Sequence, residues 1–343
     1  MSEGNLSAWE ISEAFFAAGS APRHLLEHAV HYAILAPSSH NSQPWQFRIV
    51  GDQLDIYADR TRALAVVDYA DRELIMSCGA ALFALRVCLH NLGVEPIIEL
   101  QPDDTAADLL ARVRIAGPRA TLAEDRTLFQ AITQRRTTRT PFEARELSDS
   151  LQRSLATAVE DEGAWLWRMG TPSQRAELAE IIAQADREQW SDPRVRRELA
   201  AWIHPNRHVS RDGVPGYAVG MGDLMSATAP IVMRTFDLGG GVAAGDRDIA
   251  LGSPLLAIIG TKSDNSKDWL AAGQALMHLL LRATAQGVRV SYLNQPIELA
   301  HLRWRLREML ASELYPQLCL RLGYGPMVKP TPRRAVADVL ILE

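Results

Sequence analysis

The sequence predicts an α+β fold in which one unit of helices and short strands occurs twice. Two long apolar segments carry glycines at the same 14-residue separation, Gly79 with Gly93 and Gly273 with Gly287. Each segment follows a strand or hairpin pattern and precedes another strand, unlike the regular βαβ alternation of a parallel sheet. We therefore expect a duplicated unit that folds as an internal pseudo-dimer.

The first half, residues 1–120, is predicted from changes in apolar periodicity, near 3.6 for helices and 2 for strands. Its expected elements, in order, are a helix over residues 23–36, strands at Trp45–Val50 and Leu54–Tyr57, a helix from Leu74 to Leu92, and a strand at Val113–Ala116. Gly51 and Asp52 form the tight turn of a hairpin, and Gly93 stops the long helix.

The second half, residues 121–343, begins a new helix near Asp125. Its expected elements, in order, are that helix up to Arg135, a helix at Leu147–Val159, strands at Trp165–Met169 and Leu255–Ile259, and a helix over residues 268–286. The last helix is apolar on nearly every side, which predicts deep burial.

An insertion interrupts the second half at about residues 187–247. It is rich in glycine, including Gly239–Gly241, and it carries Trp190, Trp202 and Met221. Dense glycine indicates mobile backbone, and aromatic and methionine side chains can cover an apolar surface. We expect a lid over a site; a surface excursion without a function is the alternative.

The bulk composition excludes several classes of protein. The chain has 343 residues, a net charge of -5 and a pI near 6.0, which argues against a protein that neutralises nucleic-acid phosphates. Its three cysteines, Cys78, Cys88 and Cys319, are too few and too distant for a disulfide framework. The first residues lack the pattern of a signal peptide, and no uninterrupted apolar run reaches about 18 residues. We expect a soluble, cytoplasmic protein without a membrane span.

The decapeptide Ala36–Trp45 joins the first helix to the first strand. Its Ser38, Ser39 and Asn41 offer short polar groups to a hydrogen-bonding heterocycle, and two prolines stiffen the backbone. Proline, serine and asparagine are also ordinary loop formers, so this segment alone fits a plain connection as well.

The segment Gln134–Phe142 holds three arginines within five residues, interleaved with threonines. Arginine supplies a planar fork of charge-assisted donors and threonine a compact hydroxyl, a combination that suits a phosphate. The alternative is a solvated helix end, where arginines complement the helix dipole.

Together, these motifs resemble those of FMN-dependent nitroreductases, in particular the fused, twin-domain nitroreductase-like family that includes the mycobacterial Acg proteins. In nitroreductase homodimers, each FMN lies at the subunit interface, between the arginine segment of one chain and the loop of the other. Here the first half has the loop, but the only arginine from Glu13 to Arg23 is Arg23 itself. The second half has the arginines, but Asp161–Ala164 replaces the loop. The resemblance, which covers most of the chain outside the insertion, implies one FMN site in an internal dimer.

The resemblance also implies a role for each segment of the site. The loop would contact the ring and ribityl chain, and the arginine segment would bind the phosphate, with Arg139 toward the N1/O2 edge of the flavin. Backbone groups of residues 293–295 would face N5 and O4, and Arg333 or Arg334 would add to the phosphate site. The implied cofactor residues are Pro37, Ser38, Ser39, Asn41, Arg135, Arg136, Thr137, Arg139, Leu293, Asn294, Gln295, Arg333 and Arg334. The usual Glu-Gly pair of well-studied members is absent, which leaves the nicotinamide platform open.

The implied function is an FMN-dependent oxidoreductase that uses NADPH or NADH to reduce nitroaromatic or quinone-like small molecules through flavin N5. No catalytic side chain is required, because the cofactor carries the hydride chemistry. A protein that stores or sequesters flavin under its lid is the alternative; the surviving motifs disfavour a purely structural protein. An internal dimer needs no partner subunit, and we expect neither nucleic acid nor membrane as a partner.

Two other patterns are weaker. His24, His28 and His31 share a helical face, a spacing that can bind zinc, but Glu27 is the only further ligand nearby. The run Gly239–Gly245 lacks the spacing and the βαβ context of a dinucleotide-binding loop. We expect no metal site.

Overall fold

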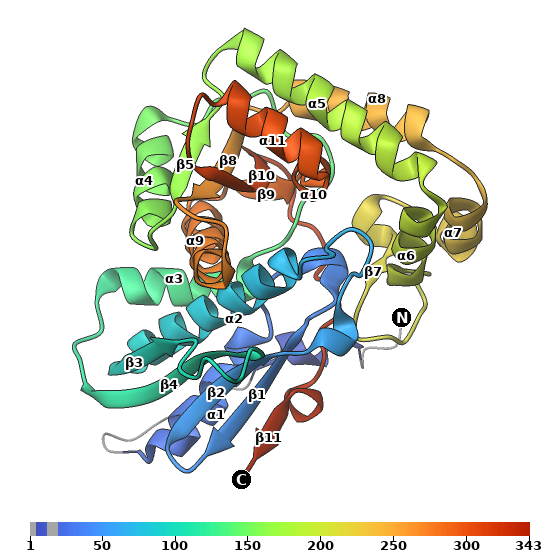
Figure 1. Ribbon diagram of the computed structural model, residues 1–343. Helices are drawn as coiled ribbons and strands as arrows, with labels where there is room; N and C mark the ends of the chain where they lie inside the picture. The colour runs from blue at the N-terminus through green and yellow to red at the C-terminus, as the bar shows by residue number, and fades with distance from the viewer. Residues whose placement is uncertain (1–4, 12–19) are drawn as a thin grey trace.

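The computed structural model describes residues 5–11 and 20–343. The other residues, 1–4 and 12–19, lie outside this description, and they include most of the segment in which the first half was expected to lack arginines. The predicted α+β class is confirmed: the described chain holds a five-stranded and a four-stranded sheet with helices packed between and around them (Figure 1).

The first half supplies four strands of the five-stranded sheet, and β11 (Leu340–Leu342) from the end of the chain supplies the fifth, in the order β11-β1-β2-β4-β3. Its elements are α1 (Pro22–Ala33), β1 (Trp45–Val50), β2 (Gln53–Ala58), α2 (Arg72–Asn91), β3 (Val94–Leu100) and β4 (Leu109–Pro118). The predicted hairpin is confirmed, because β1 and β2 pair antiparallel. The edge strand β3 was not predicted; it contains Pro96, which an edge strand tolerates but a central strand does not.

The C-terminal end of the chain returns to the first half. Strand β11 (Leu340–Leu342) pairs parallel with β1, and Leu340 lies opposite Phe47. Figure 1 shows β11, in dark red, beside the blue strands. The segment that carries Arg333 and Arg334 therefore runs from the second half to the first.

The second half builds the four-stranded sheet, with strand order β5-β8-β10-β9. Its predicted elements are present as α3 (Ala123–Gln134), α4 (Asp149–Glu160), β5 (Trp165–Arg168), β8 (Leu255–Thr261) and α9 (Ser266–Ala285). The strand expected after the helix over residues 268–286 is present as β9 (Arg289–Tyr292). The elements not predicted are α5 (Pro172–Ser191), α10 (Gln295–Glu298), α11 (Ala300–Met309) and β10 (Tyr315–Gly323). Strand β9 lies at the edge of this sheet beside β10, and it places there the segment 291–297, which contains the predicted residues 293–295.

The paired glycines lie where α2 and α9 pack against each other. A Cβ added to Gly79 would lie closer than 3.0 Å to the Leu270 carbonyl oxygen, and one added to Gly273 would lie equally close to that of Met76. The repeated sequence pattern therefore marks a reciprocal helix contact between the halves. Helix α2 is long and apolar enough to cross a membrane, but 89% of its apolar window is buried inside the molecule, as in a core helix.

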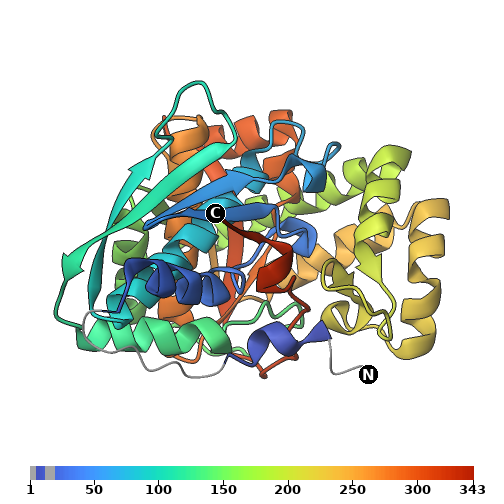
Figure 2. The same cartoon turned by 90° about the horizontal axis from the view of Figure 1, so that it is seen from below.

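The insertion is mostly helical. It follows α5 with α6 (Pro193–Trp202), α7 (Asp223–Thr235) and α8 (Gly239–Leu251), and Figure 2 shows these helices gathered on one side of the molecule. The glycine run that suggested irregular backbone instead opens α8. Glycine costs little in this first turn, because its N–H groups have no partner within the helix in any case.

Candidate functional site

A cavity of about 990 Å³ lies between the two halves and the insertion. Its size is at the upper end of the range for small-molecule sites. All the cofactor residues expected from the sequence line it except Arg334, namely Pro37, Ser38, Ser39, Asn41, Arg135, Arg136, Thr137, Arg139, Leu293, Asn294, Gln295 and Arg333. The loop after the first helix and the segments from residue 293 onward are more than 250 residues apart in the sequence, and they line the same cavity.

The loop that follows α1 is held in a strained conformation. His40, Asn41 and Gln43 have positive φ values of 52°, 56° and 55°, the left-handed region that costs a side chain about 1–3 kcal/mol. Hydrogen bonds to Ser38 hold the turn: its carbonyl accepts from the Asn41 N–H at 3.0 Å and its hydroxyl from the Gln43 N–H at 2.9 Å. Such strain persists where the surrounding structure over-determines the backbone, as at binding sites.

The Asn41 side chain joins three segments of the chain. Its amide nitrogen donates to the carbonyl oxygens of Gly213 at 2.8 Å and Pro332 at 3.0 Å, and its oxygen accepts from Arg333 Nη1 at 2.7 Å. Both amide donors are therefore used within the protein. Asn41 thus positions the loop, the insertion and the C-terminal segment around the cavity.

The arginines in the cavity wall lack carboxylate partners among the described residues. Arg135 is 3% exposed and Arg333 is 2% exposed, and the Nε atoms of both have no hydrogen-bond partner within the described chain. Burial, followed by the charges of Arg135 and Arg136, lowers the pKa of Arg333 well below its ordinary value. Buried cations without counter-charges are costly. The arrangement therefore favours an anionic ligand at this wall.

Arg139 and His40 form a second part of the wall. Arg139 donates to the Ala218 carbonyl of the insertion at 3.3 Å. Burial and then the charge of Arg139 lower the pKa of His40 to about 4, so His40 is neutral near pH 7. His40 lies within the decapeptide Ala36–Trp45, but it was not among the residues expected to bind the cofactor.

Tyr292 was also missed, although it adjoins the predicted residues 293–295. Its buried hydroxyl has no hydrogen-bond partner within the described residues. Burial raises its pKa, and the charges of Arg135, Arg139 and Arg333 oppose that rise. Its position in the motif that begins at Ser291 is the signal that could have identified it.

Two predicted residues are placed differently from the others. Arg334 lies outside the cavity, where its guanidinium donates to the Gln43 carbonyl at 3.1 Å and the Asp338 carbonyl at 2.9 Å. Leu293 lines the cavity, but its N–H donates to the Cys319 carbonyl at 2.9 Å and is therefore not free to bind a cofactor.

The insertion closes over the cavity and is attached to the first half. The Gly213 N–H donates to the Asn41 carbonyl at 3.2 Å, and the Glu198 carboxylate accepts from the N–H groups of Val66 at 2.9 Å and Val67 at 3.0 Å. Side chains of the insertion and of the end of α5 line the cavity, namely Trp190, Leu199, Tyr217, Met221 and Met233. The insertion thus forms part of the cavity wall and is bonded to the first half.

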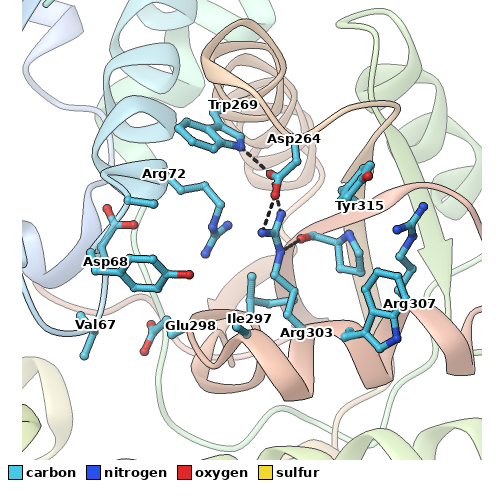
Figure 3. A pocket seen from close by; sticks show the side chains of 15 residues that line it. Val67, Asp68, Arg72, Asp264, Trp269, Ile297, Glu298, Arg303, Arg307 and Tyr315 are labelled. Atoms are coloured by element: carbon cyan, nitrogen blue, oxygen red, sulfur yellow. Dashed lines mark hydrogen bonds and ion pairs between the residues drawn. The ribbon is translucent and has the colours of Figure 1, made fainter.

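A smaller cavity of about 210 Å³ lies nearby, and none of the predicted cofactor residues lines it (Figure 3). Its Arg303 is already paired with Asp264 through two contacts of 2.8 Å, and Trp269 donates to the same carboxylate at 2.7 Å. Val67 and Glu298 line both cavities. Because Arg303 has a counter-charge, the larger cavity is the better candidate for the functional site.

Comparison with known proteins gives relatives along nearly the whole chain. No protein-family model matches the sequence. A candidate NAD(P)H nitroreductase of Mycobacterium tuberculosis (strain H37Rv) is 32% identical over 313 residues, which cover 90% of this chain and 88% of the relative. The candidate NAD(P)H nitroreductase Acg of the same strain is 27% identical, over 92% of this chain and 95% of its own.

Solved structures give weaker similarity. A nitroreductase with bound FMN from Desulfitobacterium hafniense has a TM-score of 0.39 and 12% identity, over 63% of this chain and 98% of its own. The FMN-dependent nitroreductase NfnB of Mycobacterium smegmatis, in complex with NADPH, has a TM-score of 0.37 and 16% identity, over 62% of this chain and 96% of its own. The assignment rests on the sequence relatives: with 32% identity across 90% of its length, the chain belongs to the NAD(P)H nitroreductase family.

Proposed function

We propose that the chain is an FMN-dependent oxidoreductase that uses NADPH or NADH to reduce a small nitroaromatic or quinone-like acceptor through flavin N5. The observation that supports it most strongly is the group of buried arginines without counter-charges in the cavity that also holds the Pro37–Asn41 loop. A phosphate supplies the missing negative charge. When bound, the flavin supplies the hydride chemistry.

The residues proposed to bind FMN come from both halves of the chain. Arg135, Arg136, Thr137 and Arg333 would hold the phosphate, since these side chains carry the unmatched charge and a hydroxyl in one wall. Residues 1–120 provide the stiff loop and residues 121–343 the arginines, so neither half alone completes the site. A single chain therefore suffices, and the use of NAD(P)H implies a cytoplasmic location.

Arg139 and the neutral His40 would serve the ring itself. Arg139 would supply positive charge to the N1/O2 edge of a bound flavin, which would favour the reduced form. His40 remains neutral near pH 7, so it can donate a hydrogen bond without adding a further cation. The lid excludes water and strengthens both interactions.

A flavin-sequestering protein is the second candidate, and the closed lid favours it. Trp190, Leu199, Tyr217, Met221 and Met233 line the cavity, and they would block a nicotinamide if they covered the flavin ring. If the lid stays closed, hydride cannot reach the flavin, and the protein stores the cofactor instead.

The purified protein distinguishes these functions. We expect a yellow protein with about one FMN per chain, whose flavin colour bleaches when NADPH or NADH is mixed in under anaerobic stopped-flow conditions. Colour that persists on the scale of minutes would support sequestration. A protein that takes up no FMN from an excess of the cofactor would overturn both proposals.

A further inference from the structure

Two carboxylates of the cavity have no part in the proposed flavin site. Asp186 comes from α5 and Asp246 from α8, two helices that lie side by side (Figure 1). Both residues line the cavity. Asp186 is 1% exposed, and its Oδ2 has no hydrogen-bond partner within the described residues. A buried polar atom that faces a cavity without a partner indicates a missing ligand donor.

The surroundings leave this carboxylate pair short of positive charge. The Gln295 amide donates to Asp246 Oδ2 at 2.8 Å, while Arg321 donates instead to the Thr138 carbonyl at 3.0 Å. Burial and then the charge of Asp246 raise the pKa of Asp186 to about 7, and Gln295 and Arg187 lower it only in part. Burial likewise raises the pKa of Asp246, and the Arg321 charge opposes this only in part.

The wall around the pair is apolar and broad. Apolar side chains of the insertion and of α8 that line this cavity include Trp190, Val195, Leu199, Met233, Val242 and Ile249. Gln295, which contacts Asp246, belongs to the segment expected to face flavin N5 and O4. A ligand bound here would thus contact apolar side chains, the carboxylates of Asp186 and Asp246, and the edge of the flavin that faces Gln295.

We propose that Asp186 and Asp246 select an electron acceptor that combines a flat aromatic body with a protonated nitrogen, such as an amine or amidine. The inference deepens the proposed function and rests on it, because it assigns the acceptor to the same cavity. The ammonium or amidinium group binds the two carboxylates and supplies the donor that Asp186 Oδ2 lacks. The aromatic body packs against the apolar wall and is oriented toward Gln295.

Three probes with the same reducible group test the proposal. They are 4-nitrobenzylamine, 4-nitrobenzyl alcohol and 4-nitrobenzoate, which carry a positive, a neutral and a negative end. We expect kcat/KM of the flavin-loaded wild type to be about tenfold higher for the amine than for the alcohol, and lowest for the benzoate. In the D186N/D246N double variant the amine should lose this advantage, whereas kcat/KM for the alcohol should stay within about twofold.

Two controls separate a binding role from a structural one. E177Q removes an exposed carboxylate of the same helix α5 and should keep the preference for the amine. FMN content and the rate of bleaching by NADPH should be equal in wild type and double variant. A wild type that prefers the benzoate, or a double variant that keeps the wild-type preference, would overturn the proposal.

A binding measurement makes the result independent of turnover. Calorimetric titration of the purified protein with benzylamine and with benzoate should give tighter binding of benzylamine, by about tenfold, and the difference should vanish in the double variant. If bleaching by NADPH fails while this preference holds, the proposed reductase function is wrong and the cation site stands. Equal binding of both probes by the wild type refutes the cation site.

Discussion

At the scale of single residues, the site depends on which of two neighbouring arginines faces inward. Arg333 is 2% exposed, lines the cavity and donates to the Asn41 side chain at 2.7 Å. Arg334 points the other way and pairs with Asp59 at 3.4 Å. The sequence alone does not show which of the two side chains faces the cavity, because both are adjacent cations on one short segment. Only the fold distinguishes them, because it buries Arg333 in the cavity wall and places Arg334 beside Asp59.

We predict that R333A weakens FMN binding by about tenfold to a hundredfold, the loss of one charge-assisted phosphate contact of about 1.5–3 kcal/mol. R334A should leave the FMN dissociation constant within about twofold. Fluorescence titration of the flavin-free protein measures both values.

Riboflavin, which lacks the phosphate, is the control ligand for this pair. Its affinity should be nearly the same in R333A and wild type if Arg333 acts on the phosphate. A parallel loss of riboflavin and FMN affinity would show instead that R333A distorts the loop through Asn41.

At the scale of elements, the contact between α2 and α9 joins the two halves. The backbones approach so closely at Gly79 and Gly273 that a methyl group has no space there. The neighbouring side chains of both helices are buried, so the contact cannot relax into solvent. Glycine is therefore needed at these positions for its small size.

We predict that G273A destabilises the protein by about 2–4 kcal/mol, because the new Cβ must push the Met76 backbone away. G241A is the matched control: Gly241 lies in the first turn of α8, and nothing stands within 4 Å of an added Cβ. In urea denaturation, G241A should leave stability unchanged or raise it slightly. Equal stability of G273A and wild type would contradict this view of the contact.

At the scale of the whole molecule, the contacts of the insertion with the first half are expected to control how easily a ligand enters the cavity. Glu198 attaches it to the first half by accepting hydrogen bonds from two backbone N–H groups of residues 66 and 67. The Asp212 carboxylate adds an ion pair with Arg62. Neither Glu198 nor Asp212 lines the cavity, so either contact can be broken without removing a wall residue.

We predict that E198A raises the rate of flavin bleaching by NADPH by about tenfold, because loss of the two hydrogen bonds shifts the lid toward open states. E180A, which breaks an exposed ion pair between α5 and Arg247, should leave that rate unchanged. Stopped-flow absorbance measures the rate. A rate in E198A equal to that of wild type would show that lid opening does not limit access.

The buried acid Asp186 should also influence stability as a function of pH. Its folded pKa of about 7 lies above the ordinary value of 3.8, so the folded state holds this proton more strongly than the unfolded state does. Its contribution to stability is therefore complete below pH 3.8 and is lost as the pH rises toward 7. D186N removes this dependence.

We thus expect the stability of D186N relative to wild type to increase between pH 4 and pH 8, by up to about 4 kcal/mol. Chemical denaturation at a series of pH values measures the difference. A difference that stays constant with pH would show that Asp186 ionises in the folded protein as it does in water.

The sequence by itself determined the local elements and the identity of the chemical groups. Periodicity predicted α2, α9 and the β1–β2 hairpin, and the residue types of the Pro37–Asn41 and Arg135–Arg139 segments suited a hydrogen-bonding heterocycle and a phosphate. These properties are local, because they depend on neighbours within a few residues. The resemblance to twin-domain nitroreductases then supplied the expectation that both segments share one site.

Only the tertiary structure decided how these parts meet. It brought Asn41, Gly213 and Arg333 into contact, returned β11 to the first sheet and joined Asp186 to Asp246 in one cavity. Each of these relations spans tens to hundreds of residues and has no periodic signature in the chain. They depend on packing and on the burial of charge, which the folded molecule sets as a whole.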